Sequence, residues 1–413
     1  MDNFKVKKIS PAGELILLSS RNTIDSASKR KIKELLGENL DWNFIKDLAI
    51  RNKIIHLLCN TLKNNFQSEI DEEVYTQISD EVSVHVSSNK DALNLLFDVN
   101  QLLSSEDIPV IIFKGLVFSY LVYDSSTYRC QGDIDLLVRP EDFLKARDIL
   151  IRNGFISTYF GHAEVSTVQA QLGRTDKRAS VDLHYGLTPQ YQQTNMNEAM
   201  NGSKFDRHLS NTHDKSKTRW FCYLETAPVW ERAIEIKLED ETIKTLSPED
   251  TLLVAVIHGL KENWRTLSRI SDIAAIITKY KNLNWALIQE AVANLNYRKK
   301  FFLTLRLARE IYDINLPDEI LRCTYLHGSE YLAKLIIYRF TIKNYLADFE
   351  ESRRIAAAMT MDNPVDFFRY LIYVYNTPNG PFNEQITKNN FPGFMLILTR
   401  HYINSIYLRL TGK

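Results

Sequence analysis

Apolar residues recur at intervals of three and four positions along two long parts of the chain. The first part runs from about residue 25 to residue 105 and includes pairs such as Ile45 and Leu48. The second begins at Ser247, which precedes a proline and is a plausible N-cap. This spacing places apolar side chains on one face of a helix, so we predict several helices in each part. In the second part, further helices are predicted at 285–313, 318–360, 363–376 and 391–410.

Between these helical parts the pattern changes to short apolar runs that are rich in β-branched residues, which favour strands. Strands are predicted at 108–114, 133–138, 162–172 and 179–187. Helices are predicted at 115–123 and 140–155, and a short helix followed by a hairpin is predicted within 225–246. Pro140 suits the first turn of its helix, and Gly154 suits the end. The sequence therefore predicts a core of mixed strands and helices between two helical regions.

Charged side chains interrupt the apolar strands of this core. Asp133 and Asp135 are two positions apart, so both project from the same face of their strand. Asp182 and His184 share a face of a later strand in the same way, which brings a third carboxylate to the core. Carboxylates crowded on a buried strand repel one another and lose hydration, so we expect a cation opposite them. The first hypothesis is a site for a divalent metal ion.

A lysine and a glycine stand where the first strand meets the next helix. Lys114 ends the strand and Gly115 opens the helix. The backbone amides of a helix N-terminus, the helix dipole and an ammonium group can together bind a phosphate. The dipeptide is a weak signal by itself, because a lysine whose stem lies along apolar residues explains it equally well.

Composition and charge narrow the possible functions. Lysine plus arginine and aspartate plus glutamate both total 51, so the formal net charge is zero. This balance gives no electrostatic argument for a dedicated nucleic-acid or membrane-surface protein. The four cysteines form no CxxC pair, and the first residues lack the apolar core of a signal peptide. We therefore expect a cytoplasmic protein with no membrane partner.

The motifs taken together resemble a known family. The sequence reads FKG at Phe113–Gly115, then Tyr128 and Arg129, then GDIDLLV from Gly132 and VDLHY from Val181. This pattern is similar to that of the uncharacterised nucleotidyltransferases, a bacterial group within the superfamily of DNA polymerase beta. The segment SPEDTLLVAVIHGLKENWRTLSRISDIAAII matches the C-terminal part of that group. Polymerase-beta-like enzymes usually carry Gly-Ser where this chain has Lys114 and Gly115.

The resemblance implies an α+β fold with a polymerase-beta-like core, a small mixed sheet with helices. The chain would be divided into an N-terminal helical region (1–105), the nucleotidyltransferase core (106–245) and a C-terminal helical domain (246–413). The resemblance also implies two Mg²⁺ ions and an NTP as co-substrate, with transfer of a nucleoside monophosphate to a hydroxyl of a small molecule or a protein. An RNA end is a weaker candidate for the acceptor, because the chain lacks a net positive charge.

Roles for individual residues follow from the same resemblance. Asp133, Asp135 and Asp182 would be the metal ligands and catalytic residues, with Asp182 also serving as general base. Four residues would form the nucleotide-binding part of the site, namely Lys114, Gly115, Arg129 and His184. Of these, His184 could orient the acceptor or a carboxylate. In the C-terminal segment, His258, Glu262, Arg265, Arg269 and Asp272 follow one another at helical spacing and could form one polar face over the active site. A solvated face with internal ion pairs is the alternative.

Two further interpretations remain open at this point. The chain could be a non-catalytic nucleotide sensor or an antitoxin-like interaction module built on the same fold. It could also be a purely structural helical protein in which residues 133–138 form an edge strand with solvated aspartates. A separation of more than about 10 Å between Asp182 and Asp135 would favour the second of these, since two-metal chemistry needs clustered carboxylates.

Overall fold

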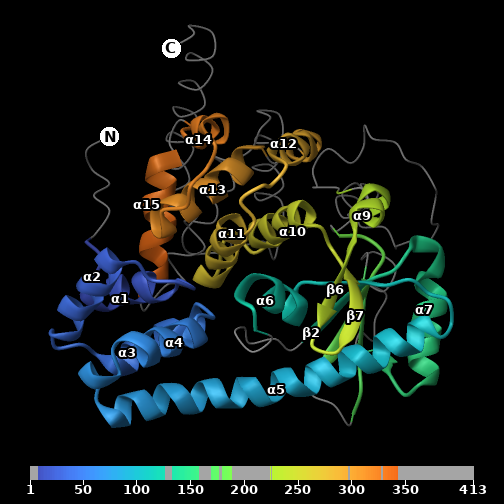
Figure 1. Ribbon diagram of the computed structural model, residues 1–413, viewed down its shortest axis with the longest axis horizontal. Helices are drawn as coiled ribbons and strands as arrows, with labels where there is room; N and C mark the ends of the chain where they lie inside the picture. The colour runs from blue at the N-terminus through green and yellow to red at the C-terminus, as the bar shows by residue number, and fades with distance from the viewer. Residues whose placement is uncertain are drawn as a thin grey trace, which may run out of the picture.

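The computed structural model describes residues 8–125, 133–157, 169–175, 179–187, 224, 226–295, 298–326 and 329–342. Within these residues the protein is a mixed α+β fold in which helices flank a small mixed sheet, as the sequence predicts (Figure 1). No helix in these described ranges is long and apolar enough to cross a membrane.

Five α-helices precede the sheet. They are α1 (Pro11–Ser19), α2 (Ser26–Leu36), α3 (Trp42–Arg51), α4 (Ile55–Asn65) and α5 (Glu72–Ser104), with a 3₁₀ turn at Gln67–Glu69. The carboxylates of Asp25 and Asp41 accept hydrogen bonds from backbone N–H groups in the first turns of α2 and α3, which satisfies groups that would otherwise lack partners. The helical part predicted from about residue 25 to residue 105 ends close to the end of α5, but α1 lies before it and was not predicted. Figure 1 shows α5 running beneath both the first helices and the sheet.

The main sheet has five strands in the order β1-β2-β5-β4-β3. Their bounds are β1 (Ile111–Phe113), β2 (Asp133–Leu137), β3 (Ile156–Ser157), β4 (Gln169–Gly173) and β5 (Ser180–His184). β2 pairs antiparallel with β1 and parallel with β5, so it lies inside the sheet. The strand predicted at 108–114 is shorter in the structure, where β1 covers only Ile111–Phe113. Only the end of the predicted strand at 162–172 falls among the described residues, where it forms β4.

Helices connect and cover these strands. α6 (Gly115–Tyr123) follows β1, and α7 (Phe143–Arg152) follows β2 after a 3₁₀ turn at Pro140–Asp142. Gly154 has a φ of 86°, a left-handed conformation that suits glycine after a helix end. α9 (Thr226–Arg232) and the hairpin of β6 (Ile234–Leu238) and β7 (Glu241–Thr245) complete this part. The predictions for 115–123 and 225–246 are confirmed.

Six helices form the described C-terminal part. They are α10 (Pro248–Lys261), α11 (Leu267–Lys279), α12 (Trp285–Asn294), α13 (Arg298–Tyr312), α14 (Asp318–Thr324) and α15 (Ser329–Phe340). Ser247 caps α10 by accepting a hydrogen bond from the backbone N–H of Asp250, as predicted. The long predicted helices at 285–313 and 318–360 are each interrupted, and the Ser329 hydroxyl donates to the Thr324 carbonyl at the second break. The helices predicted beyond residue 342 lie outside the described residues.

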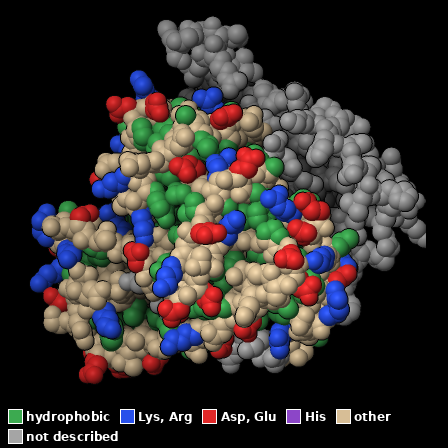
Figure 2. Space-filling view, turned by 45° about the vertical axis from the view of Figure 1, so that its right-hand side comes forward, with side chains coloured by type: hydrophobic (Ala, Val, Ile, Leu, Met, Phe, Trp, Pro, Cys, Tyr) green, Lys and Arg blue, Asp and Glu red, His purple; other side chains and the backbone are tan. Residues whose placement is uncertain are grey.

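Two apolar clusters cover the two faces of the sheet. One face presents Ile134, Leu136, Val181 and Leu183 to a cluster that includes residues of α5 and α7. On the other face, Ile111, Phe113 and Leu137 pack into a larger cluster, which also joins the first four helices to α10–α15. The N-terminal and C-terminal helices contribute to one apolar cluster. The division of the chain into three domains stays a prediction. Figure 2 shows acidic and basic side chains interspersed over the face it displays, with no field of a single sign.

Candidate active site

The carboxylates lie on one face of the sheet because of strand register. Asp135 of β2 is directly opposite Asp182 of β5 on one side and Phe113 of β1 on the other. Asp182 is in turn opposite Gln171 of β4. Residues that face each other across paired strands project from the same side of a sheet, and so do residues two positions apart. His184, two positions beyond Asp182, therefore joins the same face.

Asp135 is the centre of the polar contacts on this face. It is 9% exposed, and its Oδ1 lies 2.8 Å from Lys114 Nζ and 3.0 Å from His184 Nε2. The His184 ring also makes an edge contact with Phe113 at 5.2 Å between ring centroids. Asp133 lies at the exposed end of the strand, where Ser180 Oγ donates to its Oδ1 over 2.6 Å. The cluster thus holds Asp135 firmly and leaves Asp133 near solvent.

The two facing carboxylates have opposite pKa shifts. Burial alone would raise the pKa of Asp135, but the Lys114 ammonium and contact with His184 hold that pKa well below its usual range. Burial, together with the charges of Asp135 and Asp133, raises the pKa of Asp182 to about 6. Two carboxyl groups with pKa values pushed apart in one cluster are typical of active sites.

The donor set fits a divalent cation. Asp135, Asp182 and His184 each offer one ligand atom, and these atoms lie within 4.8 Å of one another. Asp182 Oδ1 is buried and makes no hydrogen bond within the described residues. A buried carboxylate oxygen without a partner is costly, and a bound cation would satisfy it. Carboxylate oxygens are ligands that suit Mg²⁺. The His184 imidazole could either bind the metal ion itself or orient Asp135.

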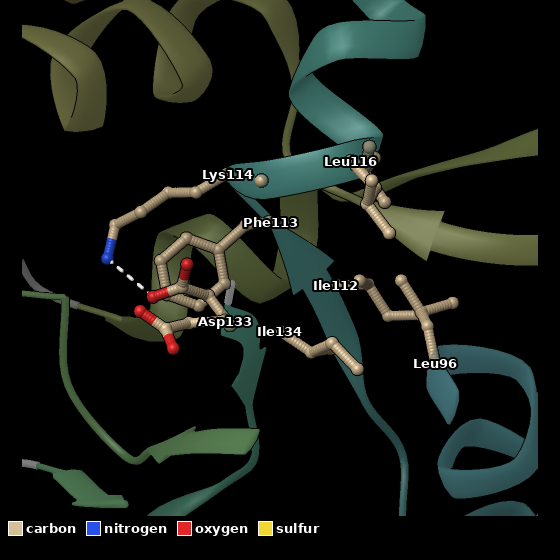
Figure 3. Close-up of a pocket in the computed structure, with 10 residues that line it drawn as sticks. Leu96, Ile112, Phe113, Lys114, Leu116, Asp133 and Ile134 are labelled. Atoms are coloured by element: carbon tan, nitrogen blue, oxygen red, sulfur yellow. Dashed lines mark hydrogen bonds and ion pairs between the residues drawn. The ribbon is translucent and has the colours of Figure 1, made fainter. Parts of the chain in front are cut away.

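Lys114 occupies a strained backbone conformation. Its φ of 58° and ψ of −155° fall in a region found almost only for glycine. It stands between β1 and α6, and Figure 3 shows its side chain extending toward the carboxylates. Strain of this kind persists where the surrounding structure enforces it, and it occurs most often at functional sites. The conformation aims the ammonium at Asp135 from the N-terminal end of α6.

This strain predicts an unusual order of stability between two variants. Lys114→Gly and Lys114→Ala both remove the ammonium, so Asp135 loses the same partner in each. We expect the glycine variant to be more stable by about 1 kcal/mol, because relief of about 1–3 kcal/mol of strain exceeds the entropic cost of glycine. Urea unfolding of the two variants measures the difference. An alanine variant at least as stable as the glycine variant would contradict the assignment of strain.

A small pocket lies beside this corner. Lys114, Gly115, Asp133 and Asp135 form its polar lining, and the remaining lining residues are Leu96, Ile112, Phe113, Leu116, Val117 and Ile134. Figure 3 shows Lys114 and Asp133 on one side of the strands, with Ile112, Ile134 and Leu96 packed together on the other. The apolar side fixes the strands, and the polar side is left to contact a ligand.

The structure brings together most of the residues that the sequence singled out. Lys114, Asp135, Asp182 and His184 form one cluster, with Asp133 beside it. The large separation that would favour the purely structural interpretation is therefore absent, and β2 is no edge strand. Arg129 lies outside the described residues, so its proposed contact with the nucleotide stays a prediction.

Two residues of the cluster were not predicted. Ser180 holds Asp133, and Gln171 hydrogen-bonds the Asp182 side chain and lowers its pKa against the larger raising effects. The alternation of the strand at 179–187 already places Ser180 on the face of Asp182. That signal could have identified Ser180, whereas Gln171 required knowledge of the strand pairing.

The polar positions between His258 and Asp272 do not form one helical face. α10 ends at Lys261 and α11 begins at Leu267, and Asn263 and Trp264 between them both have positive φ values. Glu262 instead bridges the two helices, 2.9 Å from Arg269 and 3.6 Å from His258. Asp272 turns away from this group and accepts a hydrogen bond from Tyr123 of α6. The expectation of a continuous polar face is therefore wrong, because the chain turns between the helices.

The fold and this cluster define a class of protein, one in which carboxylates on a small mixed sheet lie beside a lysine at a helix N-terminus. A family described as "Uncharacterised nucleotidyltransferase" matches residues 38–313, which is more than half of the chain. The chain belongs to this family. This membership supports nucleotidyl transfer as its chemistry.

Comparisons beyond the family add little. No curated protein matches the chain. The antibiotic-resistance factor ANT(2'')-Ia is 11% identical over 50% of this chain and 91% of its own, with a TM-score of 0.31. A nucleotidyltransferase-like protein from Paracoccidioides brasiliensis is 14% identical over 57% of this chain and 98% of its own, with a TM-score of 0.30.

Proposed function

We propose that the protein is a Mg²⁺-dependent enzyme that transfers a nucleoside monophosphate from an NTP to a hydroxyl group of a small molecule or a protein. The observation that carries this proposal is the pair of facing carboxylates, Asp135 and Asp182, together with the buried Oδ1 of Asp182, which makes no hydrogen bond to any described residue. A cluster of this kind is an electrostatic liability unless it binds a cation. The family membership supports nucleotidyl transfer as the use of that cation.

Asp133, Asp135 and Asp182 would hold the metal, for which two ions are expected in this type of reaction. Bound Mg²⁺ supplies neutralisation of the triphosphate charge and lowers the pKa of the acceptor hydroxyl. His184 would orient Asp135 through the hydrogen bond from its ring. Asp133 accepts the Ser180 hydroxyl through Oδ1, which leaves Oδ2 available to a cation.

The Lys114–Gly115 corner would bind the phosphates. The N-terminal N–H groups of α6 and the Lys114 ammonium can both donate to phosphate oxygens. The Lys114 ammonium contacts Asp135, and the side chain is 24% exposed, so it can move toward a ligand. Arg129 would add a bidentate contact.

The proposed reaction replaces one P–O bond at the α-phosphorus with another. The acceptor oxygen attacks the α-phosphorus and forms the new P–O bond, while the bond to the β-phosphate oxygen breaks and pyrophosphate leaves. Asp182 would take the hydroxyl proton, because it lies directly opposite Asp135 in the cluster and a positioned carboxylate can act as a general base. We favour a small molecule or protein as acceptor over an RNA end, since the formal net charge of the chain is zero.

Two radiolabelled nucleotides test this function. Incubation of the protein and Mg²⁺ with cell extract and α-labelled NTP should transfer label to an acceptor, whereas γ-labelled NTP should release its label as pyrophosphate. Asp135→Asn is the matched inactive control. Transfer of the γ-label would indicate a kinase instead. Binding of NTP without transfer to any acceptor would support a nucleotide sensor or an antitoxin-like module.

A further inference from the structure

The helix that begins at the phosphate corner is anchored at its other end by α11. Tyr123, the last residue of α6, donates its hydroxyl to Asp272 Oδ1 over 3.0 Å. The next residue, Asp124, lies 2.6 Å from Lys279 Nζ. Asp272 and Lys279 are seven positions apart, so they lie on the same face of α11. A single helix face therefore contacts the C-terminal end of α6 at two points.

The contact with Asp272 is buried. Tyr123 is 6% exposed and Asp272 is 4% exposed. Tyr123 also lies 3.4 Å from the hydroxyl of Ser271, which donates to the carbonyl of Ser20 at the end of α1. A carboxylate buried this deeply is costly unless hydrogen bonds satisfy it. The arrangement joins α6, α11 and the N-terminal helices at one polar point within the apolar core.

This anchor and the strain at Lys114 are mechanically linked. α6 has nine residues, so its ends are only about 12 Å apart along a rigid element. On one side of Lys114, β1 is fixed by its pairing with β2, in which Phe113 lies opposite Asp135. On the other side, α6 is fixed by α11. A conformation suited to glycine can be maintained at a lysine only while both sides are held.

We propose that Tyr123 and Asp272 are positioning residues for nucleotide binding, which act through α6 to hold the Lys114 ammonium at the phosphate corner. This inference rests on the proposed function, since it assigns Lys114 to the nucleotide. It also gives Asp272 a role that needs no contact with substrate. The C-terminal helices thereby influence the site from the far end of α6.

A pair of identical substitutions tests the proposal. Tyr123→Phe removes the hydroxyl that binds Asp272 and keeps the ring. Tyr312→Phe is the matched control, because its hydroxyl, on α13, hydrogen-bonds Ser20 and Ser271 in the same polar region, and its removal leaves the bond from Tyr123 to Asp272 in place. We expect Tyr123→Phe to weaken binding of Mg²⁺-NTP about tenfold by calorimetry, which corresponds to about 1.4 kcal/mol. The control should bind as the wild type does.

Two further readouts separate positioning from general destabilisation. Without nucleotide, hydrogen exchange of residues 114–118 should accelerate in Tyr123→Phe and not in Tyr312→Phe. In a Lys114→Met background, Tyr123→Phe should cause no further loss of nucleotide affinity, because the group it positions is gone. Equal affinity in the two single variants, unchanged exchange at 114–118, or a full additional loss in the Lys114→Met background would each overturn the inference. A wild type that binds no NTP would overturn the proposed function, and the inference with it.

Discussion

Asp182→Asn is expected to reduce nucleotidyl transfer by about 10²–10⁴-fold, the usual contribution of a general base, and at the same time to stabilise the metal-free fold. The loss of activity follows from removal of both a metal ligand and the proton acceptor. The gain in stability follows from the crowding of Asp182 beside Asp135 and Asp133 in a buried place, which raises its pKa to about 6. An amide of the same shape carries no charge and escapes that repulsion.

The stability gain has a definite pH dependence. The pKa of Asp182 is higher in the folded protein than in the unfolded chain, whose value is near 3.8. Above pH 6 the group is ionised in both states, so the folded state carries the full cost of the buried charge. Below about pH 4 both states are protonated and the cost disappears. The variant should therefore exceed the wild type by roughly 2 kcal/mol at pH 7.5 and by little at pH 4.

Urea unfolding of both proteins in EDTA, at pH 7.5 and at pH 4, measures this difference. Ser180→Ala is a useful companion, since it removes the hydrogen bond to Asp133 from β5, the strand of Asp182, without removing a charge. An Asp182→Asn variant that is less stable than the wild type at pH 7.5 would mean that Asp182 is well satisfied in the metal-free fold, and the argument for a cation site would fail.

Lys114→Met is the second large effect that we expect. The substitution keeps the apolar stem and removes the ammonium 2.8 Å from the buried Asp135 carboxylate. Breaking one side of a buried ion pair costs about 3–5 kcal/mol, and the solvent access of Lys114 places the expected loss at the lower end. Loss of a charged phosphate contact should also weaken NTP binding by about 10–100-fold.

The pH dependence of this loss has the opposite form. Lys114 and His184 hold the pKa of Asp135 below its unfolded value, so the stability they provide is complete above about pH 4 and is lost as the pH falls further. Chemical unfolding between pH 3 and pH 7 follows this change. Lys334→Met is the control, because its pair with Glu330 is exposed to solvent and should contribute little to stability. Equal losses in the two variants would contradict a special role for Lys114.

Local patterns predicted the elements that carry the site, and the reasons are physical. The helix at 115–123 and the strand from Asp133 follow from short-range hydrophobic spacing. The alternation of a strand fixes which side chains share a face, so the grouping of Asp133 with Asp135, and of Asp182 with His184, follows from sequence positions alone. The N-cap at Ser247 depends only on its own first turn.

Other features depend on contacts between distant residues. The register that places Asp182 opposite Asp135 joins strands 47 residues apart in sequence, and no local spacing specifies it. The polar positions from His258 to Asp272 have helical spacing, but spacing alone cannot reveal the turn at Asn263 and Trp264. The hydrogen bond from Tyr123 to Asp272 likewise spans 149 positions. Local patterns therefore determine the faces of the site, and tertiary packing determines its neighbours.

The central claim is that the three aspartates hold Mg²⁺ and an NTP together. Calorimetric titration of Mg²⁺ with each NTP into the wild type and into the double variant Asp133→Asn, Asp135→Asn tests it most directly. We predict Mg²⁺-dependent binding of at least one NTP to the wild type and none to the double variant, with both proteins folded by circular dichroism. Equal NTP binding by the two proteins would contradict the assignment of the site.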